Sequence, residues 1–165
     1  SSAKIASSDS RKSEAVKKML ASFLSKEKYK ELTDFEAERW RFENGRVHIL
    51  PEFFPEAKFK NVKFLKTGLM IAELKELRFG FKALPAHGFS LCLKKEDFLS
   101  SENFAQDAPE LRSYFAGETP SLPLNLLSAA PYIGICVDSF PVGFVKNEGN
   151  FVKNIYPPGW RSDRL

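Results

Sequence analysis

The C-terminal stretch Lys153–Arg161 gathers residue types that can hold a nucleic acid. Its sequence, Lys-Asn-Ile-Tyr-Pro-Pro-Gly-Trp-Arg, brings cations, an amide and two aromatic rings into one short segment. Lysine and arginine contact phosphates, and aromatic rings stack on bases. The two prolines restrict the backbone and therefore stiffen the segment that carries these side chains. Taken alone, the stretch predicts a basic, aromatic tail on a small domain.

Basic and acidic residues are also segregated along the chain. The net charge is +4, yet Glu56–Lys82 carries seven Lys or Arg against three Glu, and Lys95–Pro120 carries two bases against six acids. Such segregation is expected where one face meets a polyanion. It also occurs on an ordinary solvated surface whose lysines are unevenly placed. Charge alone leaves both interpretations open.

Several kinds of catalytic site are missing from the sequence. No two glycines are spaced as Gly-x-Gly, and no phosphate-binding loop motif is present, so neither a dinucleotide nor S-adenosylmethionine has its usual backbone turn. Two histidines and two cysteines share no metal-ligand spacing. Cys92 and Cys136 lie in apolar runs and are predicted to be buried, reduced thiols, which favours a cytoplasmic setting. A small enzyme with a site around His87, Asp138 and Cys136 is the weakest alternative.

The N-terminal segment, residues 1–37, is predicted to be a helical linker with a disordered tip. Ser1–Ser10 is small and polar, apolar residues follow a helical spacing over Lys12–Ser25, and the spacing of Tyr29, Leu32 and Phe35 indicates a second short helical stretch. That apolar face could pack on the chain's own domain or on a neighbouring domain.

Residues 38–165 are predicted to form an α+β domain with a curled, barrel-like sheet, and a division near residue 100 stays open. Asn44-Gly45 between alternating segments is a strong hairpin signal. Pro85 predicts a helix running to about Lys95, and Asp107 is the expected N-cap of a helix that ends at Gly117. The further predicted strands are Val62–Leu65, Leu69–Ala72, Tyr132–Val137, Val142–Val145 and Phe151-Val152, the last three as an antiparallel meander.

Motifs in both halves of this domain resemble those of bacterial RsmF-type rRNA cytosine-C5 methyltransferases. They are Gly68-Leu69-x-x-Ala72-Glu73-x-Lys75, Arg78-Phe79, Pro85-Ala86-His87, Val137-Asp138-Ser139-Phe140-Pro141-Val142-Gly143 and Lys153–Arg161. The resemblance covers roughly residues 38–161, and the motifs follow the family's order. The chain departs from the family pattern at Ala86, Ser139 and Phe144.

The resemblance implies a PUA-like pseudo-barrel that binds RNA, placed behind a catalytic domain of the NOP/Sun type. The missing glycine turn and the lack of a Pro-Cys dipeptide agree with a chain that holds only the part behind that catalytic domain. We therefore expect an RNA-binding accessory domain with no catalytic residue, metal or cofactor of its own. S-adenosylmethionine would belong to the full-length enzyme. The expected partners are ribosomal RNA and the N-terminal methyltransferase domain, with a monomeric state and no membrane.

The candidate RNA contacts lie in two basic stretches. They are Lys66, Lys75, Arg78 and Lys82 in the first, and Lys146, Lys153, Asn154, Tyr156 and Arg161 near the C-terminus. Each has a plainer alternative: the lysines could be solvated, Tyr156 could close the barrel, and Arg78 or Asn154 could hold loops through backbone hydrogen bonds. The competing function is a protein-interaction or scaffolding module that contacts the catalytic domain or a ribosomal protein.

Overall fold

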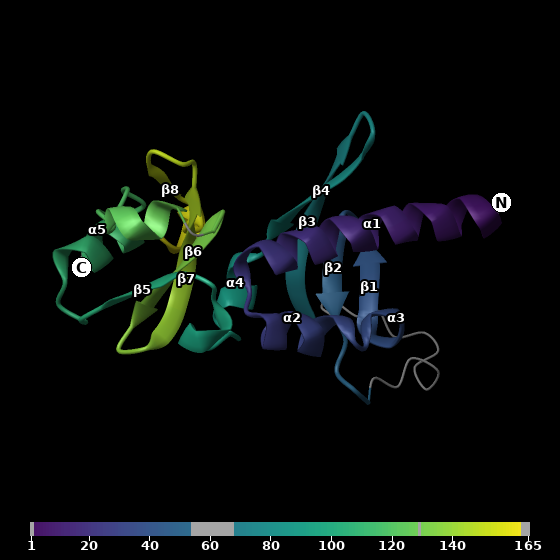
Figure 1. The fold of residues 1–165 in the computed structure, drawn as a ribbon, viewed down its shortest axis with the longest axis horizontal. Helices are drawn as coiled ribbons and strands as arrows, with labels where there is room; N and C mark the ends of the chain where they lie inside the picture. The colour runs from purple at the N-terminus through teal and green to yellow at the C-terminus, as the bar shows by residue number, and fades with distance from the viewer. Residues whose placement is uncertain (1, 54–67, 129, 163–165) are drawn as a thin grey trace.

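Two four-stranded sheets lie side by side along the long axis of the molecule, as a computed structural model shows (Figure 1). The structure describes residues 2–53, 68–128 and 130–162. The first half contains α1 (Ser2–Phe23), α2 (Lys26–Thr33), α3 (Glu36–Arg39), β1 (Trp40–Glu43), β2 (Arg46–Ile49), β3 (Leu69–Leu77), β4 (Gly80–Pro85) and α4 (His87–Ser90). The second half contains β5 (Ser101–Phe104), α5 (Pro109–Ala116), β6 (Tyr132–Val137), β7 (Phe140–Asn147) and β8 (Val152–Asn154). Short 3₁₀ turns lie at Lys95–Asp97, Leu124–Ser128 and Pro158–Trp160.

The first sheet is antiparallel and has the order β1-β2-β3-β4. Its β1–β2 hairpin confirms the Asn-Gly prediction, because Asn44 and Gly45 have φ angles of 49° and 71°. Two successive positive φ angles are the mark of a type I′ turn, whose twist matches that of the paired strands. The predicted strand Val62–Leu65 lies outside the described residues.

The long helix α1 packs on this first sheet. Val16, Leu20 and Phe23 have no solvent exposure, and they belong to one apolar cluster with residues of β2, β3 and β4. The apolar face therefore packs on the chain's own domain, which is one of the two alternatives that the sequence left open. The helix also begins at Ser2 rather than Lys12, and an ion pair between Lys12 and Asp9 supports its early turns at 2.9 Å. Apolar spacing could not have indicated these turns, since it marks only the part of a helix that is buried.

The second sheet has the order β5-β6-β7-β8, in which β5 runs parallel to β6 and the other pairs are antiparallel. The predicted C-terminal meander is thus confirmed as β6, β7 and β8. Helix α5 packs on this sheet, and the hydroxyl of its Tyr114 donates a hydrogen bond to the carbonyl of Phe144 at 3.2 Å. Helices and two sheets together give the expected α+β class.

The segment after β4 differs from the prediction. The helix expected from Pro85 to Lys95 is wrong, because Pro85 ends β4 and α4 is a single turn at His87–Ser90. The amide of Ala86 still bonds the carbonyl of Ile71 at 3.0 Å, so strand pairing runs past the proline. Cys92, on the exposed side of the following turn, is not buried as expected, whereas Cys136 is.

The start of α5 also lies one residue later than predicted. The N-cap is Ala108 rather than Asp107, Pro109 occupies the first turn, and Gly117 ends the helix with a φ of 87°. Among the described residues, no helix combines the length and apolar character that crossing a membrane requires.

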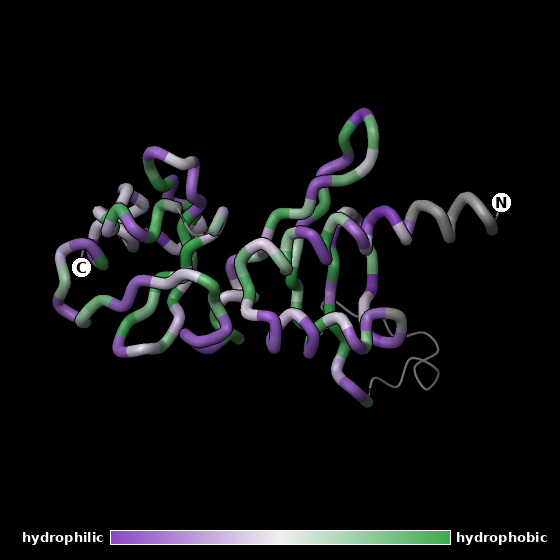
Figure 2. Tube along the Cα trace, in the orientation of Figure 1, coloured by the Kyte–Doolittle hydropathy of each residue, from purple (hydrophilic) through white to green (hydrophobic). Residues whose placement is uncertain are grey.

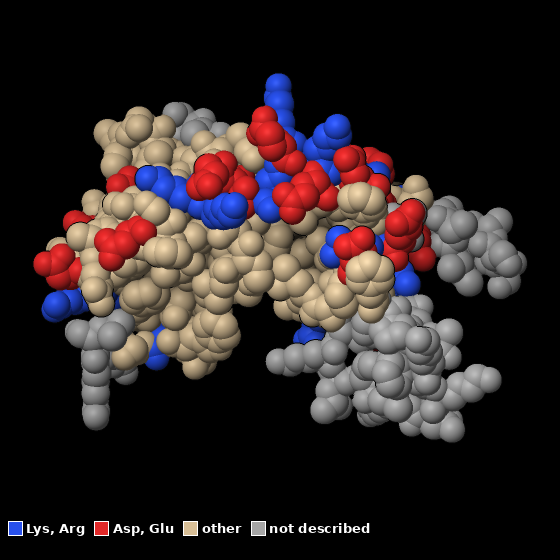
Figure 3. Space-filling model, turned by 90° about the horizontal axis from the view of Figure 1, so that it is seen from below, with Lys and Arg blue, Asp and Glu red and all other residues tan. Residues whose placement is uncertain are grey.

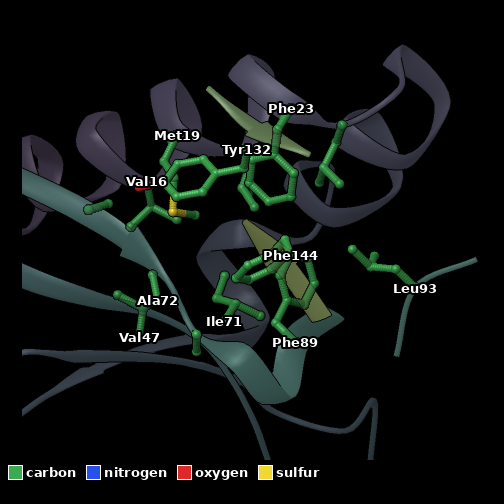
Figure 4. Packing of buried hydrophobic residues seen from close by; sticks show 14 of the residues in the cluster. Val16, Met19, Phe23, Val47, Ile71, Ala72, Phe89, Leu93, Tyr132 and Phe144 are labelled. Atoms are coloured by element: carbon green, nitrogen blue, oxygen red, sulfur yellow. The ribbon is translucent and has the colours of Figure 1, made fainter. Parts of the chain in front are cut away.

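A single aromatic cluster joins the two halves (Figure 4). The ring of Phe23 on α1 lies 6.5 Å from the ring of Phe89, 5.6 Å from Tyr132 on β6 and 6.1 Å from Phe144 on β7. These edge-on contacts add to the apolar area that the rings bury. The two sheets consequently share part of one core, which holds them in a fixed relation.

Candidate nucleic-acid interface

A groove with a volume of about 360 Å³ lies between the two sheets and carries four lysines. It is lined by Glu73, Lys75, Lys82, Leu84, Pro85, His87, Tyr132, Phe144, Lys146, Lys153 and Ile155. Lys75 and Lys82 come from the first sheet, and Lys146 and Lys153 come from the second. We call these residues the four groove lysines. Residues separated by most of the domain's length therefore meet at one site.

Strand register places the groove lysines in two directly opposed pairs. Lys75 faces Lys82 across β3 and β4, and Lys146 faces Lys153 across β7 and β8. Like charges opposite each other destabilise a sheet, by roughly 0.2–1 kcal/mol per pair. Two such pairs at one groove lower the stability of the free protein. A polyanion bound in the groove would offset both repulsions.

Two carboxylates modulate this positive charge. Glu73 lines the groove, and Glu148 accepts a hydrogen bond from Lys146. That hydrogen bond lowers the pKa of Glu148, with further lowering from the nearby charges of Lys146, Lys153 and Lys82. Within the described parts of the chain, Lys75, Lys82 and Lys153 form no ion pair. Three of the four ammonium groups thus carry no competing ion pair, and the fourth, Lys146, is paired at a partly exposed position.

His87 forms part of the groove wall and is held by aromatic rings. Its ring lies edge-on to Tyr156 at 5.0 Å and to Trp160 at 5.2 Å, and neither ring nitrogen has a hydrogen-bond partner among the described residues. Burial lowers the pKa of His87, so the imidazole is neutral at physiological pH. The positive charge of the groove therefore comes from lysine alone.

Figure 3 shows one face of the molecule with its charged residues coloured. On that face basic and acidic residues are interspersed along one edge, and most of the remaining surface is uncharged. Interspersed charges of both signs give little net attraction for a polyanion. The lysine groove differs from such a mixed distribution, because four lysines and one carboxylate, that of Glu73, line it.

The structure brings together four of the nine predicted contacts. Lys66 lies outside the described residues, and Arg78 sits in the turn between β3 and β4. Asn154, Tyr156 and Arg161 do not line the groove. Sequence reasoning missed Glu73 and His87 as groove residues; strand alternation from Lys75 would have indicated Glu73.

Asn154 has the hydrogen bonds of a structural role, the alternative to RNA contact that the sequence left open. The side chain is 8% exposed, and its Nδ2 donates to the carbonyls of Tyr114 (2.8 Å) and Glu118. Its Oδ1 accepts from the amide of Tyr156 at 2.7 Å. With both donors and the acceptor engaged, the amide fastens β8 to the end of α5 and has nothing left to offer a base.

Replacing Asn154 by Ala should therefore lower stability and leave the electrostatics of binding intact. Two buried carbonyls would lose their donor, at a cost of about 2 kcal/mol, or about 6 °C in Tm for a chain of this size. Thermal unfolding followed by circular dichroism measures the loss. An unchanged Tm combined with a shallower salt dependence of RNA binding would restore Asn154 to the interface.

Tyr156 and Arg161 also fasten the C-terminal tail. The Tyr156 ring packs against Tyr114 at 5.2 Å and Phe115 at 5.3 Å, so it closes an aromatic cluster rather than offering a free face. The guanidinium of Arg161 donates through Nε and Nη2 to the carbonyl of Tyr156, at 3.4 and 3.3 Å. It also lies against Gly117, where a Cβ atom would approach it to 2.4 Å. The tail is thus mainly a structural closure, and of its two cations Lys153 lines the groove whereas Arg161 does not.

The alternative of an enzymatic site around Cys136 finds no support in the geometry. The thiol is buried, and burial raises its pKa to about 11. A protonated, buried thiol is a poor nucleophile.

The second sheet carries a family signature. Residues 101–162 match the family model of the methyltransferase RsmF PUA domain. This segment is similar to the RsmF PUA domain. The match begins where β5 begins and covers less than half of the 165 residues, so it assigns the second sheet with α5 and the tail. Among curated proteins, no relative matches the chain.

The match confirms the resemblance drawn from the C-terminal motifs. It relates the C-terminal region to the PUA domain of a methyltransferase. The groove is composite, because the segment that matches the RsmF PUA domain contributes Lys146 and Lys153 while the preceding sheet contributes Lys75 and Lys82.

Proposed function

We propose that this chain docks ribosomal RNA for an S-adenosylmethionine-dependent cytosine-C5 methyltransferase, and that the lysine groove holds the RNA backbone. One observation carries the proposal: two opposed lysine pairs, one from each sheet, face the same cavity. Phosphate contacts of this kind position an RNA without reading its sequence.

The shared core makes the groove a preformed site. Phe144 lines the groove and also packs against Phe23, so this residue belongs both to the groove wall and to the core between the sheets. A rigid groove loses little conformational freedom when the RNA binds, which leaves more of the interaction energy as affinity. Affinity would then come from the ammonium groups at the rim, and the apolar floor would set how deep the backbone enters.

The catalytic step belongs, in this proposal, to a methyltransferase domain that binds S-adenosylmethionine and holds the nucleophilic cysteine. The sequence supports this division, since it has neither the Gly-x-Gly turn nor a Pro-Cys dipeptide. We further propose that the chain divides at residue 100 into an N-terminal unit with the first sheet and the PUA domain, and that it acts as a monomer in the cytoplasm. Two free cysteines fit a reducing compartment.

Binding of a fluorescein-labelled helix-loop fragment of small-subunit rRNA, followed by anisotropy, tests the proposal. We expect binding at low salt that weakens steeply as salt increases, because each neutralised phosphate releases counterions. Isothermal titration with S-adenosylmethionine should show no heat of binding to this chain. Absence of RNA binding at low salt, together with binding to an isolated methyltransferase domain, would replace the proposal with a protein-interaction module.

A further inference from the structure

The β3–β4 hairpin extends beyond the sheet to which it belongs. Pairing between β2 and β3 ends at Arg46 with Glu73, followed by one backbone bond from Leu74 to Gly45 at 2.7 Å. The β3–β4 ladder continues to the pair of Leu77 with Gly80. The outer part is therefore a two-stranded arm, which projects from the molecule in Figure 1.

The tip of this arm is apolar, aromatic and basic at once. Phe79 is 87% exposed and Leu77 is 52% exposed, and the guanidinium carbon of Arg78 lies 5.2 Å from the centre of the Phe79 ring. Figure 2 shows the hydrophilic residue at the very tip with hydrophobic residues on both sides. An exposed phenylalanine on a projecting turn adds nothing to the core. Cation–π attraction favours this placement of the guanidinium, and guanidinium groups themselves stack on flat aromatic faces.

The arm connects this tip directly to the lysine groove. Glu73 and Lys75 line the groove from β3, and strand alternation places Leu77 next on the same face. Leu74, Glu76 and Phe81 lie on the other face, where they line a separate cavity with Lys12 and Phe42. Two residues of strand span about 7 Å, so the apolar tip begins about 7 Å beyond the Lys75–Lys82 pair.

We propose that the arm tip stacks on an unpaired base of the RNA whose backbone occupies the lysine groove, with Phe79 as the stacking ring. The inference rests on the proposed function and adds the class of nucleotide recognised. The cations beside the tip favour RNA over an apolar partner, because Arg78 and the Lys75–Lys82 pair would have to be desolvated against a protein surface. Bases in a paired stem are not accessible to a ring, whereas loop and bulge bases are. The chain thereby selects RNA with unpaired nucleotides.

Phe79→Ala tests the inference with two labelled RNAs, one a stem closed by a uridine loop and the other the same stem as a blunt duplex. We expect about a ten-fold loss of affinity for the looped RNA, with the duplex affinity and the salt slope unchanged. Phe79→Trp should restore binding to the looped RNA. Phe140→Ala is the matched control: that ring is 75% exposed, sits in another hairpin, and does not line the groove.

The possible outcomes separate this inference from the proposed function. Equal affinity of wild type and Phe79→Ala for the looped RNA overturns base stacking, while loss of binding on lysine substitution would still support the groove. Absence of RNA binding by the wild-type chain removes both. An effect of Phe79→Ala confined to attachment to anionic lipid vesicles, or to an isolated methyltransferase domain, also overturns stacking and assigns the arm to that partner.

Discussion

Replacement of all four groove lysines by glutamine should lower the affinity of the chain for RNA by about 200-fold at about 0.15 M salt. On a single strand each phosphate contact changes the logarithm of the binding constant by about 0.7 per decade of salt. Between about 1 M and about 0.15 M salt, each contact therefore contributes about 0.6 log units of affinity. Four contacts then contribute about 2.3 log units. Anisotropy titrations of the wild type and the variant at one salt concentration measure the loss.

Two comparisons separate a loss of affinity at the groove from the effects of a lower net charge and of unfolding. A control that replaces Lys18, Lys26, Lys30 and Lys94 has the same net charge, and these exposed lysines do not line the groove. We expect the control to bind within a few-fold of the wild type. The groove variant should be at least as stable as the wild type, because glutamine removes two opposed like-charge pairs. Equal losses in both variants would indicate nonspecific attraction instead of a site.

Phe23→Ala should have the largest effect on stability of any single substitution considered. The side chain has no exposure and its ring contacts Phe89, Tyr132 and Phe144, which come from both halves of the molecule. Truncating a buried phenylalanine costs about 3–5 kcal/mol, or about 10 °C in Tm for a chain of this size. Because the cavity lies in the core that both sheets share, we also expect weaker RNA binding through loosening of the groove.

Thermal and urea unfolding followed by far-UV circular dichroism and tryptophan fluorescence measure this effect. Wild type should unfold in one transition by both probes, and the variant should unfold earlier or in two separate steps. Phe151→Ala, which removes a phenylalanine that is 60% exposed, should change Tm little. A variant that keeps wild-type stability would show that the two halves are not held by this cluster.

The parts of the fold with local signals could be predicted from sequence. The Asn44-Gly45 turn and the C-terminal meander depend on backbone preferences of adjacent residues, and the structure confirms both. The helix predicted after Pro85 is wrong, because a proline fits both the first turn of a helix and the end of a strand. Long-range pairing of Ala86 with Ile71 decided between the two, and a local pattern does not contain that contact.

The sequence indicated which kinds of residue the candidate site contains, but it placed only some of them correctly in the fold. Lys75 with Lys82, and Lys146 with Lys153, lie symmetrically about their hairpin turns, so the pairing was implicit in the sequence once the turns were placed. That the two pairs meet in one groove depends on how the sheets pack, which sequence periodicity does not define. For Asn154 the sequence left two roles open, because an amide next to a lysine looks the same in sequence whether it faces RNA or a backbone carbonyl.

The salt dependence of RNA binding, compared between the wild type and the variant that lacks the four groove lysines, tests the central claim most directly. With four phosphates contacted, a plot of the logarithm of the binding constant against that of salt concentration should have a slope of about −3 for the wild type. The same plot for the variant should be nearly flat. Identical slopes would contradict the account, because the phosphates would then be neutralised by residues outside the groove.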